Sequence, residues 1–244
     1  RLMLETSAIM EMHDLRFAYH PARKDEEPLL KPDLEREWGV GGWATTRREG
    51  GTFKMWYRVQ PRAPEGDWLP ESSLVAYAES SDGVNWKKPE LGLRELYGED
   101  RNNYTDLPFS SVVIMPDKTG KHRYRAAGSV IAESVPHALR PRPDLEDGYY
   151  TAYSDDGLHW EIDPEPFCRT RCDVIGGGWD PVEERYLLLP KLNTRYNGLM
   201  RRSVCWTDAA EFGNWGPLRT ALCPSEEDDF EARRRGAAAV DYQY

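Results

Sequence analysis

Residues 80–86 read Ser-Ser-Asp-Gly-Val-Asn-Trp, and residues 154–160 read Ser-Asp-Asp-Gly-Leu-His-Trp. Both follow the pattern Ser-x-Asp-Gly-x-x-Trp, and both come after a short stretch rich in Tyr and Ala. A degraded third copy, residues 207–215, keeps an Asp and the final Trp with a longer spacing between them. A supersecondary unit that recurs along a chain is the signature of a repeat protein, so this motif decides the fold.

Each motif ends a longer unit with a constant order of elements. Reading backwards from each Trp, the sequence predicts a strand, a variable loop, a second strand, a tight turn and a third strand. One further extended stretch follows the Trp. Four consecutive antiparallel strands per repeat are typical of a β-propeller blade. No long segment shows 3.6-residue periodicity, and 18 prolines are spread along the chain, which disfavours a helical solenoid.

The predicted fold class is therefore all-β, a β-propeller of four-stranded antiparallel blades. Residues 1–37 are predicted to form an N-terminal arm, and residues 38–244 a partial propeller domain. The domain divides into three blades and the start of a fourth, at residues 38–97, 98–170, 171–222 and 223–244. Propellers close with about 4–8 blades, so the sequence predicts that the remaining blades belong to a longer polypeptide.

Composition narrows the possible functions. The net charge of −10 argues against nucleic acid, whose binding depends on clustered Lys and Arg. No apolar run is long enough to predict a membrane-spanning helix. The spacing of the four cysteines matches no zinc pattern, so free thiols are predicted, with a single disulfide as the alternative. The cysteines are Cys168, Cys172, Cys205 and Cys223. Neither a metal nor an organic cofactor is predicted.

The repeated motif itself is predicted to be structural. Asp and Gly are the residues expected in a turn between two strands, since Asp bonds backbone amides and Gly accepts a positive φ. The Trp is expected to fold back over the turn and to pack against the neighbouring blade. A catalytic role for Asp82 and Asp156 is disfavoured, because a mechanism rarely needs the same acid in every repeat.

Beyond the repeat, residues 77–92 and 153–160 resemble five-bladed propeller glycoside hydrolases of families 32 and 43, above all uncharacterised bacterial proteins of the family-32 type. Residues 20–22, 53–58 and 224–228 fit the same group, so the resemblance extends from His20 to Asp229. It implies a five-bladed propeller that hydrolyses an oligosaccharide or glycoside with paired carboxylates. The family-32 motifs Trp-Met-Asn-Asp-Pro, Arg-Asp-Pro and Glu-Cys are not intact; Arg171-Cys172-Asp173 is the nearest trace.

Glycosidic bond cleavage uses two carboxylates on either side of the scissile bond. In a propeller they project from the starts of the innermost strands, where the candidate catalytic acids are Asp173, Asp106 and Glu37, with Asp241 in an equivalent position in the fourth unit. Asp173 is the leading candidate because it opens its strand beside Arg171, whose charge would keep it ionised. A structural role, capping the end of the strand, is the alternative for this Asp.

Substrate-binding candidates come from the loops between the second and third strands of each unit, which open on the same face as the acids. Trp68 and Tyr196 are candidates for stacking on sugar rings, and Arg195 for binding hydroxyls or an acidic substituent; Arg171, beside Asp173, is a further substrate-binding candidate. Glu133 is an alternative general acid carried by a loop. For each of them an ordinary solvated side chain is the simpler interpretation.

Three functions are compatible with these features: a glycoside hydrolase, a glycan-binding propeller without catalysis, and a protein-interaction scaffold. The first is preferred, with an oligosaccharide or glycoside as its partner and neither nucleic acid nor membrane. Convergent acids with exposed aromatics would favour the hydrolase, and aromatics without paired acids the glycan-binding protein. Self-association and the cellular compartment are left open by the sequence.

Overall fold

Three four-stranded antiparallel sheets make up the described part of the chain. The computed structural model describes residues 13–14, 18, 20–65, 74–131, 142, 144–196 and 198–241. The first sheet contains β1 (Glu37–Val40), β2 (Thr45–Glu49), β3 (Thr52–Pro61) and β4 (Leu74–Ser80). The second contains β5 (Ser111–Pro116), β6 (Tyr124–Val130), β7 (Gly148–Ser154) and β8 (Glu161–Ile162). The third contains β9 (Ile175–Asp180), β10 (Arg185–Tyr196), β11 (Leu199–Ala209) and β12 (Arg219–Leu222).

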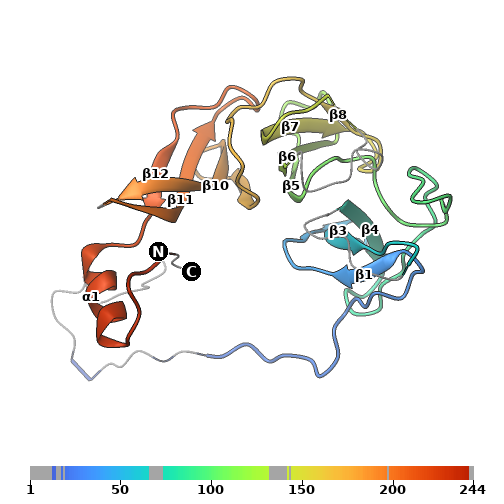
Figure 1. Cartoon of the computed structure of the whole chain (residues 1–244). Helices are drawn as coiled ribbons and strands as arrows, with labels where there is room; N and C mark the ends of the chain where they lie inside the picture. The colour runs from blue at the N-terminus through green and yellow to red at the C-terminus, as the bar shows by residue number, and fades with distance from the viewer. Residues whose placement is uncertain are drawn as a thin grey trace.

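The sheets stand side by side along an arc, with strands of successive sheets facing a shared interior (Figure 1). The prediction of an all-β chain built from four-stranded antiparallel sheets is confirmed. The second and third sheets follow chain order from the innermost to the outermost strand, β5 to β8 and β9 to β12. Closure of the sheets into a five-bladed ring stays a prediction.

In the first sheet the innermost edge is made by two strands in tandem. β1 pairs with the end of β3, where Val40 lies opposite Val59, and β2 pairs with its beginning, where Thr45 lies opposite Trp56. Between them the backbone leaves the ladder, although the Gly41 amide still donates to the Arg58 carbonyl at 2.9 Å. The predicted arm therefore contributes its last residue, Glu37, to the first sheet.

Apolar side chains from neighbouring sheets fill the spaces between them. One core joins the first and second sheets around Trp56, Ile114 and Tyr124, and a second joins the second and third sheets around Tyr149 and Leu188. A third core covers the outer face of the first sheet. The cores therefore lie between the sheets, and bulky aromatic side chains supply much of their buried apolar surface.

The repeated motif has the structural role predicted for it. Gly83 and Gly157 adopt φ angles of 79° and 84° in the two turns. The indole of Trp160 folds back and donates to the Gly157 carbonyl at 3.1 Å, and Trp56 of the first sheet donates to the same oxygen at 2.6 Å. A side chain at Gly157 would place its Cβ 2.6 Å from Trp56, so the turn and the packing between sheets both require glycine here.

The motif carboxylates are held in local turn networks. Asp82 accepts hydrogen bonds from the Asn85 side chain and from the Asn85 and Val84 amides, which together hold its pKa far below the usual range. Burial raises the pKa of Asp156, but hydrogen bonds from the His159 side chain and amide and the Leu158 amide outweigh it, leaving a pKa of about 2. Both carboxylates serve to fix the turn.

The third sheet departs from the prediction between residues 191 and 199, which were expected to form a loop. β10 and β11 instead continue as a long hairpin, with Lys191 opposite Val204 and Tyr196 opposite Leu199. The stretch contains Leu, Thr and Tyr at positions that suit a strand, and pairing along both backbones stabilises the extension. Arg195 and Tyr196 consequently lie on a strand near the hairpin tip.

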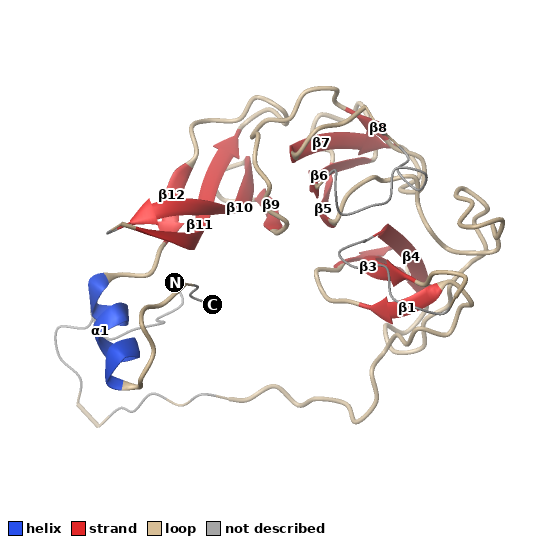
Figure 2. Cartoon of the chain, in the orientation of Figure 1, coloured by secondary structure: helices blue, strands red, loops and turns tan. Residues whose placement is uncertain are grey.

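The chain after the third sheet forms a helix, α1 (Glu226–Arg234), rather than the predicted start of a fourth blade (Figure 2). Ser225 caps the helix: its hydroxyl accepts from the Asp228 amide at 3.3 Å, and its amide donates to the Asp228 carboxylate at 2.7 Å. Such a capping box satisfies amides that the first turn leaves without partners. Within the described residues, no helix has the length and apolar character needed to cross a membrane.

A buried ion pair fastens α1 to the third sheet. Arg201 of β11 contacts Asp229 through two hydrogen bonds of 2.8 and 2.5 Å, and the two side chains are 1% and 5% exposed. Val240 closes the arrangement, since its amide donates to Asp229 and its carbonyl accepts from Arg201. The hydrogen bonds from Arg201, followed by the one from Val240, lower the pKa of Asp229 to about 2.

This pair predicts acid sensitivity of the C-terminal segment. The folded-state pKa of Asp229 lies below the value of about 3.9 expected for an unfolded Asp, so its stabilising contribution is present above pH 4 and is lost as pH falls towards 2. We expect Asp229→Asn to lower the melting temperature at pH 6, and the difference from wild type to shrink between pH 4 and pH 2. Calorimetric unfolding of both proteins across this range checks the prediction; a difference that is constant with pH would contradict it.

The four cysteines are free, as the simpler interpretation of the sequence held. Cys172 and Cys205 are buried, while Cys168 and Cys223 are half-buried. Burial raises the pKa of Cys168 and of Cys205, so these thiols stay protonated at neutral pH.

Candidate functional site

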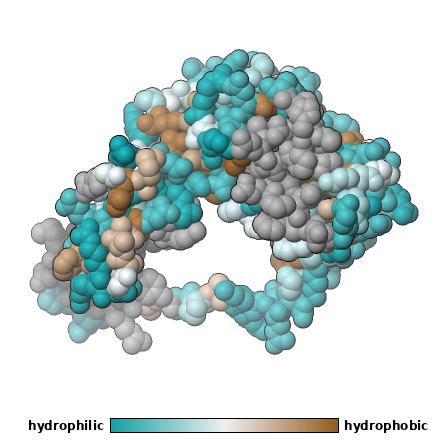
Figure 3. All heavy atoms as spheres, viewed as in Figure 1, coloured by the Kyte–Doolittle hydropathy of each residue, from teal (hydrophilic) through white to brown (hydrophobic). Residues whose placement is uncertain are grey.

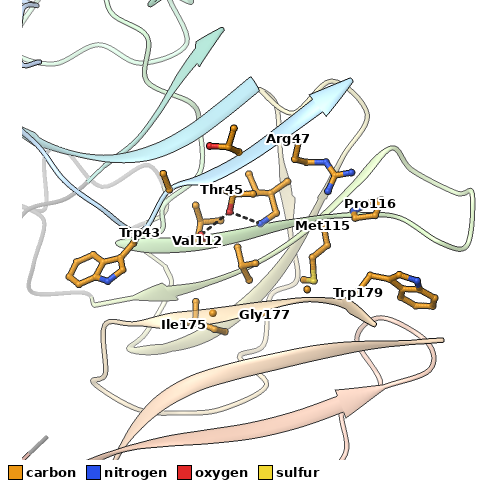
Figure 4. Close-up of a pocket in the computed structure, with 15 residues that line it drawn as sticks. Trp43, Thr45, Arg47, Val112, Met115, Pro116, Ile175, Gly177 and Trp179 are labelled. Atoms are coloured by element: carbon orange, nitrogen blue, oxygen red, sulfur yellow. Dashed lines mark hydrogen bonds between the residues drawn. The ribbon is translucent and has the colours of Figure 1, made fainter. Parts of the chain in front are cut away.

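The innermost strands of the three sheets line one open cavity of about 650 Å³. Figure 3 shows the open space that the arc leaves at its centre, and Figure 4 shows the cavity with its lining residues. The lining comes from consecutive residues of three segments: 43–47, 112–116 and 175–179. Gly176, Gly177 and Gly178 carry no side chain, which keeps the cavity wide on the β9 side.

The three strands begin at the same end of this cavity. Thr45, at the start of β2, accepts from the Ile114 amide at 3.2 Å and donates to the Val112 carbonyl at 3.4 Å (Figure 4). Ser129, which pairs with Ser111 at the start of β5, donates to the carbonyl of Asp173 at 2.9 Å. Asp173 therefore lies at the same end as the beginnings of β2 and β5, as expected for the start of an innermost strand.

Asp173 is half-exposed and forms an ion pair with Lys191 of β10. The backbone supports this contact, because the Lys191 amide donates to the neighbouring Val174 carbonyl at 2.9 Å. Tyr149 donates to the carbonyls of both Val174 and Lys191, at 2.7 and 2.8 Å, and fixes the two strands together. A carboxylate held on such a rigid support is oriented without being buried.

Arg58 of β3 brings a second cation to this end of the cavity. Burial lowers the pKa of the Arg58 guanidinium, and the negative charge of Asp173 counteracts part of that effect. The interaction crosses from the first sheet to the third, so Asp173 and Arg58 lie within electrostatic reach of each other. The guanidinium carbon of Arg58 lies 4.8 Å from the ring centre of Trp43.

Trp43 is a residue of this site that the sequence reasoning missed. It lines the cavity, its side chain is 44% exposed, and its φ angle is 58°. The sequence signal was Gly41-Gly42 directly before it, a pair that indicates an interruption of the strand rather than its regular beginning.

Asp241, the acid expected in the fourth unit, is held by Arg202. Two hydrogen bonds from Arg202, of 2.8 and 2.5 Å, hold its carboxylate and lower its pKa, and Lys191 contributes a smaller share. The Asp241 carbonyl accepts from the Arg202 amide at 3.0 Å. The carboxylate of Asp173 thus contacts Lys191, whereas that of Asp241 contacts Arg202.

Glu37 does not reach the cavity. Its side chain is fully buried, and Lys88 contacts it at 2.6 Å while the Asp33 and Leu34 amides donate to the same oxygen. Its other oxygen accepts from Tyr57 at 3.5 Å. The expected place at the start of an innermost strand is taken by β2, because β1 pairs with the far end of β3 and turns Glu37 into a buried partner of Lys88.

Asp106 is likewise separated from Asp173. It accepts from the Trp160 amide at 3.0 and 3.2 Å, and Trp160 belongs to the turn that follows β7, at the opposite end of the second sheet. Burial raises the pKa of Asp106, while the hydrogen bond from Trp160 counteracts part of this rise. The structure therefore does not bring the three predicted acids together.

The arginine expected to accompany Asp173 has another partner. Arg171 is 62% exposed and contacts Asp147 at 3.1 Å, whereas Lys191 takes the position beside Asp173. Arg195 lies four residues beyond Lys191 on β10, roughly 13 Å at the rise of a strand. Tyr196 is 41% exposed, with the Arg201 guanidinium 5.8 Å from its ring centre.

Two further candidates, Trp68 and Glu133, lie outside the described residues. Among the described residues, no group of three or more His, Cys, Asp or Glu side chains is arranged to hold a metal ion.

The comparisons with known proteins concern the fold. No family model and no curated protein sequence matches the chain. A solved structure of a putative glycoside hydrolase from Bacteroides ovatus matches with a TM-score of 0.51 and 14% identity, over 85% of this chain and 64% of that one. A β-1,2-mannobiose phosphorylase from Listeria innocua matches with a TM-score of 0.50 and 12% identity, over 79% of this chain and 62% of that one.

The chain thus spans less than two thirds of the length of either structure. At these identities the matches show a shared fold. The fold is one that carbohydrate-processing proteins use, in agreement with the resemblance found in the sequence.

Proposed function

We propose that this protein is a carbohydrate-processing enzyme that acts on an oligosaccharide or glycoside at the Asp173 end of the central cavity. One observation carries the proposal: a half-exposed carboxylate, Asp173, stands at the start of an innermost strand, beside a cavity of about 650 Å³ and two cations. A cavity of this size accommodates a small ligand. The fold shared with a putative glycoside hydrolase supports the same class of substrate.

In the proposed reaction Asp173 is the principal carboxylate. The Lys191 ammonium pairs with its carboxylate, and the Ser129 hydroxyl donates to its backbone carbonyl, so the side chain is held in place for the role of base or nucleophile. Glycoside hydrolysis also needs a proton donor for the leaving oxygen. Asp241, which Arg202 holds, is the described acid to be tested in that role. We also propose that the three sheets are blades of a five-bladed propeller.

Phosphorolysis is the second candidate function, because the positive charges near Asp173 suit the binding of inorganic phosphate. A phosphorolytic enzyme needs one carboxylic acid and a cationic site for inorganic phosphate, which replaces the attacking water. Lys191 pairs with Asp173 and Arg58 lies within electrostatic reach of it, and Lys and Arg are the residues that bind phosphate oxygens. The similar fold of the β-1,2-mannobiose phosphorylase adds support.

The experiment compares both reactions on one set of substrates. The wild-type protein is incubated with β-1,2-mannobiose, cellobiose, sucrose and a panel of p-nitrophenyl glycosides, with and without inorganic phosphate. Free sugar formed without phosphate supports hydrolysis, and a sugar 1-phosphate formed only with phosphate supports phosphorolysis. Binding of these sugars without turnover would indicate a glycan-binding protein without catalysis. Absence of both binding and turnover would reject the proposal.

A further inference from the structure

The backbone of Trp43 adopts a conformation that a large side chain rarely occupies. Its φ of 58° lies in the left-handed region, which Gly and Asn enter readily and bulky residues do not. The conformation arises where the edge of the first sheet is interrupted between β1 and β2, opposite Arg58. Gly41 and Gly42 occur directly before it, yet the left-handed position itself carries a tryptophan.

Packing explains little of this choice. The Trp43 side chain is 44% exposed, and Trp43 belongs to none of the three apolar cores. Its described aromatic contact is with the Arg58 guanidinium, 4.8 Å from the ring centre. Strained positions cluster at ligand sites, so the place of Trp43 in the structure bears on its role.

The location of Trp43 indicates what that role is. The residue lines the central cavity together with β2, β5 and β9, and Figure 4 places its indole at one end of the row of lining residues. Arg58 connects it to Asp173, whose charge acts on the guanidinium. A flat aromatic surface, a half-buried guanidinium and a carboxylate therefore lie near one end of the cavity.

We propose that Trp43 and Arg58 form a binding subsite for a pyranose ring. The C–H face of the sugar stacks on the indole, which offers a rigid apolar surface with a polar edge, and Arg58 donates hydrogen bonds to sugar hydroxyls. The interruption between β1 and β2 places Trp43 at the lining of the cavity, as strand irregularities do next to ligand sites. This inference rests on the proposed function and assigns it a substrate-recognition residue.

The test separates binding from stability. Glycine suits a positive φ, so Trp43→Gly should fold with an unchanged or higher melting temperature while its affinity for sugar falls about tenfold or more, equivalent to about 1.4 kcal/mol or more. Trp43→Phe, which keeps an aromatic face, should lose less of the affinity for sugar than Trp43→Gly does. Binding of β-1,2-mannobiose, cellobiose and sucrose is measured by calorimetry, together with a glycan array of pyranosides.

Tyr97 provides the matched control. It is also an exposed aromatic residue in the left-handed region, with φ 54° and 41% exposure, and it does not line the cavity. Tyr97→Gly should therefore leave sugar binding unchanged. If Trp43→Gly binds sugar as wild type does, or if it lowers the melting temperature by several degrees, the inference is overturned. A wild-type protein that binds no pyranoside on the array would overturn it as well.

The outcomes also distinguish this inference from the proposed function. Binding lost in Trp43→Gly, together with full turnover in Asp173→Asn, would uphold the subsite and reject the proposed reaction centre. Wild-type binding in Trp43→Gly, together with lost turnover in Asp173→Asn, would do the reverse.

Discussion

Asp173→Asn is expected to lower turnover of the substrate identified in the panel by about 10²- to 10⁴-fold, the range for loss of a group that transfers a proton in the transition state. The amide has nearly the same shape as the carboxylate, and Asp173 is half-exposed, so the fold should be retained. The backbone carbonyl that accepts from Ser129 is unaffected by the change. Affinity for substrate should change little, which places the loss in kcat rather than in KM.

The measurement is steady-state kinetics of wild type and variant under identical conditions. Asp155→Asn is the control, because Asp155 is an exposed Asp in the turn after β7, at the other end of the second sheet. It should have wild-type kinetics. Asp241→Asn tests the second carboxylate in the same assay. If Asp173→Asn turns over within about twofold of wild type, a range too small for a lost acid or base, Asp173 is not the reaction centre.

Glu37→Gln is expected to destabilise the protein by about 3 kcal/mol, the lower end of the cost of removing one partner of a buried ion pair. Glu37 is fully buried and Lys88 is 7% exposed, so among the described residues the lysine would keep Asp33 as its one remaining carboxylate partner. For a chain of this length such a loss lowers the melting temperature by roughly 6–12 °C. Thermal and urea unfolding of the variant give both quantities.

A second substitution makes this prediction specific to the ion pair. Lys88→Met added to Glu37→Gln removes the buried charge while keeping much of the side-chain volume, and should restore at least part of the stability. Glu90→Gln, at an exposed position near Lys88, is the control and should unfold as wild type does. If the double variant is less stable than Glu37→Gln alone, the uncompensated charge of Lys88 is not the cause of the loss.

The location of Glu37 also shows how a sequence can mislead about a site. Its position before the first predicted innermost strand matched that of Asp173, yet the first sheet has two short strands on that edge, and β1 directs Glu37 to Lys88. The contact spans 51 residues of chain. Local residue patterns carry no information about such a partner.

The C-terminal helix was missed for a different reason. Ser225-Glu226-Glu227-Asp228 carries a capping-box pattern with acidic residues in the first turn, which are local signals of a helix start. Expectation of a fourth blade outweighed these signals. In contrast, the continuation of β10 and β11 through residues 191–199 depends on pairing between the two strands, which only the assembled hairpin provides.

The repeated sheets could be predicted from local residues, because Asp-Gly turns and the Trp that closes each of them act within a few residues of chain. It also indicated Asp173, which opens an innermost strand. The groups near that carboxylate depend on the assembled sheets: Lys191 comes from the next strand, and Arg58, which contacts Trp43, comes from another sheet. Turns depend on local backbone chemistry, whereas the composition of the site depends on which distant strands the buried aromatic side chains bring together.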